Sequence, residues 1–111
     1  NENEKKLISR HEIKATLEDF IKISAQLLKS KGEIYMVHKP ERLVDIIYLM
    51  RENKLEVKEL KFIYSSEGKE SNLVLIKAIK GGNKFLKILE PLFIYEKNGK
   101  YSEKINRIYS E

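Results

Sequence analysis

The spacing of the apolar residues changes from helical to alternating near residue 55, and this change constrains the fold more than any other feature of the sequence. Upstream, apolar residues recur every three or four positions on both sides of one short, continuous apolar run. Downstream, apolar and polar residues alternate, as they do in a strand that buries one face. A chain with both patterns in this order is expected to pack helices on a β-sheet, which is an α/β fold.

Two helices are expected, one on each side of the continuous apolar run. The first begins at Thr16, whose hydroxyl can cap its amino end, and ends at Gly32 as a left-handed cap. The second has Pro40 in its first turn and closes at Asn53. Each helix has one apolar face at helical spacing. The members of these faces are Leu17, Phe20, Ile21, Ser24, Leu27 and Leu28 in the first helix, and Leu43, Ile46, Ile47 and Met50 in the second.

Three strands are expected from the remaining apolar segments. Residues 33–37 are apolar without alternation, which predicts a strand buried on both faces, as in a parallel sheet. Two more strands, at residues 57–64 and 72–79, are joined by a polar loop at residues 65–71. A loop this short joins antiparallel neighbours, because a parallel pair needs a longer crossover. The expected architecture is one buried strand of the parallel type between two helices, followed by an antiparallel hairpin.

A basic extension over residues 84–111 is expected to follow the hairpin. Its extended stretch is interrupted by Pro91, an Asn98-Gly99 turn follows, and Ser102 can cap a short final helix. The chain has a net charge of +5, and in the C-terminal third the cations from Lys77 to Arg107 outnumber the few acidic residues among them. A basic surface favours polyanions, so a stand-alone RNA-binding module is one interpretation. The alternative is a lysine-rich composition without functional meaning.

The sequence excludes several classes of protein. It has no cysteine, so disulfides and thiolate metal sites are absent, and a cytoplasmic location is expected. No apolar run is long enough for a membrane span. There is no glycine-rich loop between a strand and a helix, no metal-ligand spacing around the two histidines and no nucleophile elbow. These absences predict that the chain lacks a self-contained catalytic apparatus.

Two short segments are candidates for substrate binding. His38, Lys39 and Arg42 follow the strand at residues 33–37, where open α/β sheets bind their ligands. The other segment places three ionisable residues before the first helix, where they could contact phosphate or a base. A helix-capping or solvated role is the competing explanation for both segments. The residues of the second segment are Arg10, His11 and Glu12. The aromatic residues Tyr35, Tyr48, Phe62 and Tyr64 are interpreted as core or half-core residues.

Several segments together resemble the tRNA(Val) adenine-N6 methyltransferases, which belong to the class I "methyltransferase small domain" proteins. The similarity extends over nearly the whole chain and keeps the order of the segments. The matching segments are residues 8–13, 16–19, 27–29, 32–43, 72–76 and 80–82. Lys39 stands where the family commonly has Arg, which keeps the charge but loses the bidentate fork.

The resemblance implies a Rossmann-like fold and a specific place within it. Family members bind S-adenosylmethionine with a glycine-rich loop after their first strand, and hold adenine with an Asn-Pro-Pro-Tyr motif after their fourth. Neither motif occurs here. The 111 residues are therefore expected to be a single partial domain, the C-terminal half of a methyltransferase that acts on tRNA. No catalytic, cofactor-binding or metal-binding residue is expected in it.

Further expectations follow from that placement. Arg10, His11, Glu12, His38, Lys39 and Arg42 would border the substrate crevice of the complete enzyme. An O-methyltransferase or an N-methyltransferase acting on another acceptor remains open, because the residues that define the acceptor lie outside the chain. The edge of the strand at residues 33–37 would be unpaired and could drive self-association.

Overall fold

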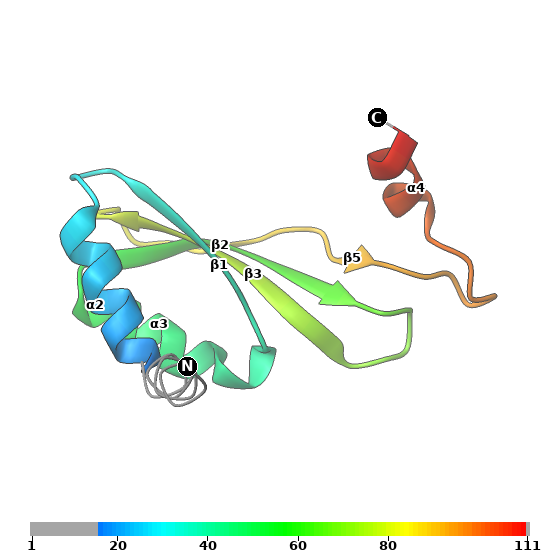
Figure 1. Cartoon of the computed structure of the whole chain (residues 1–111), viewed down its shortest axis with the longest axis horizontal. Coiled ribbons are helices and arrows are strands. Elements are labelled where there is room, and N and C mark those ends of the chain that lie inside the picture. Colours follow the sequence, from blue (N-terminus) through cyan, green and yellow to red (C-terminus); the bar gives the residue numbers. More distant parts are fainter. Residues whose placement is uncertain (1–15, 111) are drawn as a thin grey trace, which may run out of the picture.

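The computed structural model describes residues 16–110, which form three α-helices and five strands (Figure 1). The N-terminal part of this region alternates helix and strand, whereas the C-terminal part is mostly extended. In chain order the elements are α2 (Leu17–Leu27), β1 (Glu33–His38), the 3₁₀ turn η1 (Pro40–Arg42), α3 (Leu43–Glu52), β2 (Leu55–Tyr64), β3 (Ser71–Lys80), β4 (Lys87–Ile88), β5 (Leu92–Phe93) and α4 (Glu103–Ser110).

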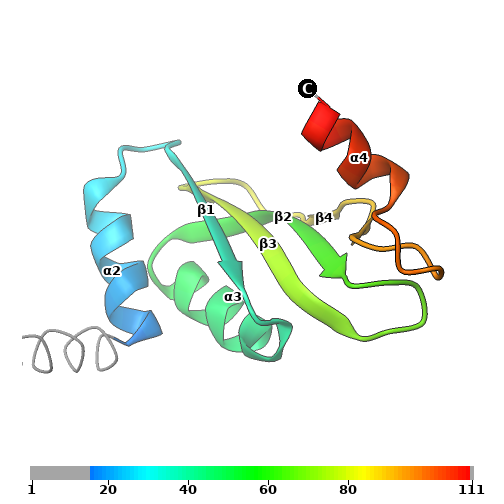
Figure 2. The same ribbon diagram turned by 45° about the vertical axis from the view of Figure 1, so that its right-hand side comes forward.

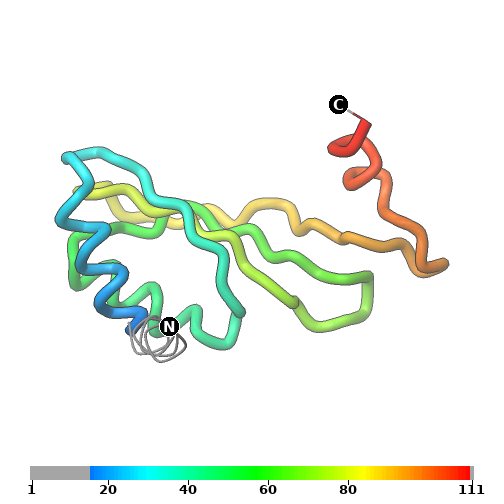
Figure 3. The backbone as a smooth tube through the Cα atoms, viewed as in Figure 1, coloured from blue at the N-terminus to red at the C-terminus, as the bar shows by residue number. Residues whose placement is uncertain are grey.

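The sheet is mixed, with the order β1-β3-β2-β4 and with β5 also paired to β2. Strand β3 is antiparallel to both of its neighbours, so β1 and β2 run in the same direction. Helix α3 connects these two strands as a crossover, and the hairpin then returns β3 into the space between them (Figure 3). The antiparallel hairpin expected from the short polar loop is confirmed.

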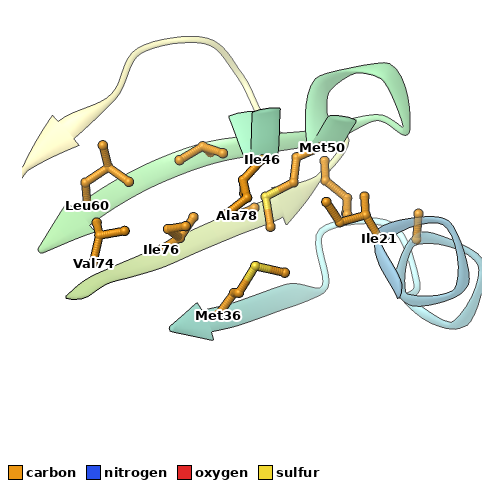
Figure 4. Packing of buried hydrophobic residues seen from close by; sticks show 11 residues of the cluster. Ile21, Met36, Ile46, Met50, Leu60, Val74, Ile76 and Ala78 are labelled. Carbon is orange, nitrogen blue, oxygen red and sulfur yellow. The ribbon is translucent and has the colours of Figure 1, made fainter. Parts of the chain in front are cut away.

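Both α2 and α3 lie on the same face of this sheet (Figure 2). Ile21 and Ala25 of α2 and Ile46 and Met50 of α3 pack against the sheet side chains that point toward them (Figure 4). Alternation along the strands selects those side chains, because successive residues point to opposite faces. The buried sheet residues are Met36, Leu55, Val57, Leu60, Val74, Ile76 and Ala78.

Helix α2 starts where the sequence predicts, but it does not end where the sequence predicts. Thr16 is the N-cap, and its Oγ1 accepts a hydrogen bond from the Asp19 amide at 3.0 Å. The helix ends at Leu27, and the left-handed residue that follows is Lys31, with φ 69°, not Gly32. Gly32 is needed for a different reason: a Cβ there would lie 2.9 Å from the carbonyl oxygen of Lys29. Close backbone approach explains this glycine.

The predicted apolar face of α2 is only partly confirmed. Ile21 is fully buried and Leu17 packs against the core, but Phe20 and Leu27 are 52% and 80% exposed. The buried stripe continues through Ala25 instead. The helix therefore has more apolar residues than one contact with the sheet can cover. Helix α3 follows the prediction, with Pro40 in the preceding turn, Asn53 as C-cap, and Ile46 and Met50 fully buried.

The expectation that the strand at residues 33–37 is buried on both faces is wrong for the described part of the chain. Strand β1 is at the edge of the sheet, and of its residues only Met36 is buried. Tyr35 and Val37 point to the face without helices and are 58% and 54% exposed. A continuous apolar run indicates that both faces are apolar but does not supply the elements that cover them. Tyr48 on α3 is 63% exposed, so it is not a core residue either.

The extension after β3 runs along the free edge of β2 and ends in a helix away from the core (Figure 1). Strands β4 and β5 each pair parallel with β2, on the two sides of Pro91. Gly99 has the positive φ of 84° that the predicted turn requires. Ser102 accepts a hydrogen bond from the Ile105 amide at 3.3 Å, which confirms it as the cap of α4.

Candidate functional site

Two loops meet where β1 and β2 end. One follows β1 and leads into η1, and the other connects β2 to β3. The pairing of His38 with Val74 places the residues just before Val74 beside those just after His38. The loops enclose an open depression of about 620 Å³. The residues that line it are Lys39, Pro40, Glu41, Glu70, Ser71 and Asn72.

The depression is lined by several charged and hydrogen-bonding side chains. Lys39 brings an ammonium group, Glu41 and Glu70 bring carboxylates, and Asn72 brings an amide. Ser71 is already engaged, because its Oγ lies 3.0 Å from the carbonyl oxygen of Ile63 and 2.9 Å from that of Leu73. This hydroxyl stabilises the register shift at the end of β2. The remaining groups suit a polar ligand that approaches from solvent.

The structure brings only one of the three candidates that follow β1 into this depression. Lys39 lines it. His38 is half-buried, lies on the helix side of β1 with Met36, and its Nδ1 is 3.3 Å from the carbonyl oxygen of Lys39. Arg42 is turned along the helix, where its Nε donates a hydrogen bond to Asp45 Oδ2 at 3.0 Å. Their participation in substrate binding stays a prediction.

The other candidate segment, Arg10, His11 and Glu12, lies outside the described residues. The sequence interpretation missed the opposite wall of the depression, formed by Glu70, Ser71 and Asn72. The sequence predicts Glu70 and Ser71 only as part of the loop between the strands, and Asn72 as the first residue of the return strand. The strand pairing was the available signal, because an antiparallel hairpin next to β1 brings the start of its return strand to the end of β1.

A second depression, of about 230 Å³, lies on the other side of the same loop. Glu67, in the loop between β2 and β3, contributes to its lining. The Tyr64 and Phe93 rings stack nearby, with their centroids 5.3 Å apart. The lining residues are Glu67, Phe93, Tyr95, Glu96, Lys97 and Ser102.

On the face of the sheet without helices, Lys77 is the central charge. Its Nζ lies 3.7 Å from Glu33 and 3.9 Å from Glu59, and 6.0 Å from the centroid of the Tyr35 ring. Partial desolvation opposes protonation, but the two carboxylates outweigh it and raise the pKa of Lys77. Lys77 therefore stays charged between these two carboxylates on the helix-free face of the sheet.

Residues 16–110 contain no group of three or more side chains that could hold a metal ion. Among the helices of this region, none is long and apolar enough to cross a membrane.

The fold is α/β, with a mixed sheet whose two parallel strands flank an antiparallel one, and with helices on one face. No protein-family profile matches the sequence, and no curated protein matches it either. Among solved structures, it is similar to the crystal structure of a predicted O-methyltransferase from Agrobacterium tumefaciens, with a TM-score of 0.75 and 21% identity. The match covers 84% of this chain and 45% of that chain, so the chain spans less than half the length of the methyltransferase. The described fold therefore resembles part of a methyltransferase structure.

Proposed function

We propose that this chain is the C-terminal half of a class I S-adenosylmethionine-dependent methyltransferase domain, and that the complete domain methylates N6 of an adenine in tRNA. One observation carries the first part of the proposal. The described sheet has the order β1-β3-β2, with an antiparallel strand between two parallel ones, and the chain is similar over 84% of its length to part of the structure of a predicted O-methyltransferase. The tRNA substrate rests on the sequence resemblance.

The surface of the described residues supports the proposal that another half of the domain packs on it. Among the exposed large apolar side chains, one group lies on the helix-free face of the sheet and another along α2. These are Tyr35, Val37 and Leu73 on the sheet, and Phe20, Ile23 and Leu27 on the helix. Helices of a front half would cover both groups, as in an α/β sheet with helices on both faces.

The free edge of β1 supports the same proposal. Its only partner among the described strands is β3, so its other edge presents unpaired backbone groups. The fourth strand of the complete sheet would pair there. The parallel directions of β1 and β2 agree with a sheet that is parallel up to this point and reverses only at β3.

The connection between β1 and η1 is the single residue Lys39, without the glycines that let a backbone approach a cofactor closely. We therefore assign cofactor binding to the front half and assign the depression between the two loops to the rim of the substrate crevice. Lys39 would contact RNA phosphate there through its single ammonium group, without the bidentate hydrogen bonds that an arginine guanidinium can form.

The acceptor is tested on the complete protein by methyl transfer from S-[methyl-³H]adenosylmethionine to unmodified tRNA, followed by digestion to nucleosides. The proposal predicts label in N6-methyladenosine. Label in a 2′-O-methylnucleoside would instead favour an O-methyltransferase, the class predicted for the structural neighbour. Absence of transfer to any RNA would contradict the RNA part of the proposal. Lys39→Gln, with Lys29→Gln as the matched control at an exposed position before β1, then tests whether the rim contacts RNA.

A further inference from the structure

Within the described residues, all non-glycine positions with a positive φ lie at one end of the sheet. They are Lys31, Lys54 and Phe85, with φ of 69°, 63° and 93°. Strands β1 and β2 begin at this end and β3 ends there, so it is opposite the crevice (Figure 1, left). The Lys31 amide donates to the carbonyl oxygen of Lys80 at 2.8 Å, and the Gly81 amide to that of Lys54 at 2.9 Å. Both lysines therefore adjoin the segment that leads to Phe85.

These three positions are strained without contributing to the core. Glycine is the usual residue at a positive φ because it has no Cβ, so a larger residue there weakens the fold. All three side chains are exposed. Residues held in rarely populated backbone conformations gather at functional sites. The side chains at these positions therefore indicate a contact with another molecule.

Four lysines, which we call the lysine cluster, surround the segment after β3. Lys31 Nζ lies 2.7 Å from the carbonyl oxygen of Gly81. Lys58 Nζ lies 2.7 Å from the carbonyl oxygen of Asn83 and 3.0 Å from that of Lys84. A carbonyl group has no net charge, so these bonds position the ammonium groups but do not neutralise them. The members of the cluster are Lys31, Lys54, Lys58 and Lys84.

The carboxylates at this end of the sheet do not cancel the charge of the cluster. Glu56 accepts hydrogen bonds from Arg51 on both of its oxygens, and Glu33 lies 3.7 Å from Lys77. Glu52, the last residue of α3, is exposed and is one carboxylate against four lysines. The lysine cluster therefore has an excess of positive charge, which attracts polyanions.

Phe85 adds an open aromatic ring to this positive surface. Its side chain is 89% exposed, and Lys58 holds the two carbonyl groups that precede it. Phe85 leads into β4, at the opposite edge of the sheet from β1, so a front half that pairs with β1 would leave it uncovered. An open ring beside cations suits single-stranded nucleic acid, because a base can stack while phosphates bind the cations. A lipid surface is less favoured, since one projecting ring buries little apolar area.

We propose that Phe85 and the lysine cluster form a binding site for single-stranded RNA, in which Phe85 stacks on one base and the lysines contact neighbouring phosphates. The choice of RNA over DNA rests on the proposed function. Strand β1, six residues long, separates this site from the crevice by about 20 Å. An RNA that occupies both would therefore be held at two separate points.

The test measures binding of fluorescein-labelled 12-nucleotide oligouridylate to the full chain by fluorescence anisotropy at several salt concentrations. Phe85→Leu should weaken binding about tenfold, the loss expected for one stacked base, and leave its salt dependence unchanged. Lys84→Gln should instead lower the slope of log Kd against log salt by about 0.7, the value for one phosphate contact with a single strand. Tyr48→Leu on α3 and Lys100→Gln in the turn at Gly99 are the matched controls and should change neither quantity.

Glycine variants separate RNA binding from a structural role. Lys54→Gly and Phe85→Gly relieve a positive φ, so each should raise the urea midpoint of unfolding while weakening RNA binding. Equal effects of Phe85→Leu and Tyr48→Leu would overturn the proposal, as would glycine variants that bind RNA normally. Tighter binding of oligodeoxythymidylate would contradict the choice of RNA. Phe85-dependent binding to phosphatidylserine vesicles, without binding to RNA, would assign the surface to lipid instead. None of these results requires methyl transfer, so failure here is distinguishable from failure of the proposed function.

Discussion

At the residue scale, the ion pair between Arg51 and Glu56 joins the end of α3 to the start of β2. Arg51 donates from both Nε and Nη2 to the two carboxylate oxygens, with Nε to Oε1 at 3.1 Å. The Glu56 side chain is only 15% exposed, so it depends on this partner. The hydrogen bonds from Arg51 outweigh desolvation and lower the pKa of Glu56. Lys58 and Lys84 act in the same direction.

This pair predicts an acid-dependent loss of stability. Because the pKa of Glu56 is lowered in the folded state, its contribution is complete above the unfolded pKa of about 4.3 and is lost as the pH falls through the folded value. In urea titrations, Glu56→Gln should have a lower midpoint than the unmodified chain at pH 7, and the difference should close below about pH 4. Glu67→Gln, in the exposed loop, is the control. A constant difference down to pH 3 would contradict the assignment.

At the element scale, Lys80 of β3 closes the end of α2. Its Nζ lies 2.5 Å from the carbonyl oxygen of Ala25 and 2.7 Å from that of Leu28, which have no partner within the helix end. A cation at a helix C-terminus also interacts favourably with the helix dipole. The contact joins segments more than 50 positions apart and fixes α2 against the sheet.

Removing this cap should destabilise the chain. Lys80→Met keeps the aliphatic stem and deletes the donors, so we expect a loss of about 1–3 kcal/mol in the free energy of unfolding, the range for charged hydrogen bonds. Amide hydrogen exchange should rise first in the last turn of α2. Lys69→Met, in the exposed loop, should change neither quantity. A Lys80→Met chain as stable as the control would show that water replaces the lysine without loss.

Most elements could be predicted from the sequence because their signals are local. Thr16 caps α2 through its neighbour Asp19, and Ser102 caps α4 through residues within one turn. The end of α2 was misassigned because close approach of Gly32 to the Lys29 carbonyl, and not a positive φ, requires that glycine. The exposure of β1 and the second wall of the crevice depend on which strands become neighbours. Apolar spacing carries no information about that choice.

At the scale of the whole molecule, the exposed edge of β1 and the apolar face beside it predict self-association of the isolated chain. Sedimentation velocity should show a concentration-dependent shift from monomer to dimer. Val37→Lys places a charge on that apolar face and should favour the monomer, whereas Val44→Lys, on α3 and 79% exposed, should not. A single monomeric species at high concentration would contradict self-association through the edge of β1.

Binding of S-adenosylmethionine, measured by isothermal titration calorimetry, tests the central claim most directly. The titration is made on the 111-residue chain and on the same chain extended by the residues encoded before Asn1. The proposed division of the domain predicts no binding to the chain and micromolar binding to the extended protein. Micromolar binding to the chain alone, or none to the extended protein, would contradict it.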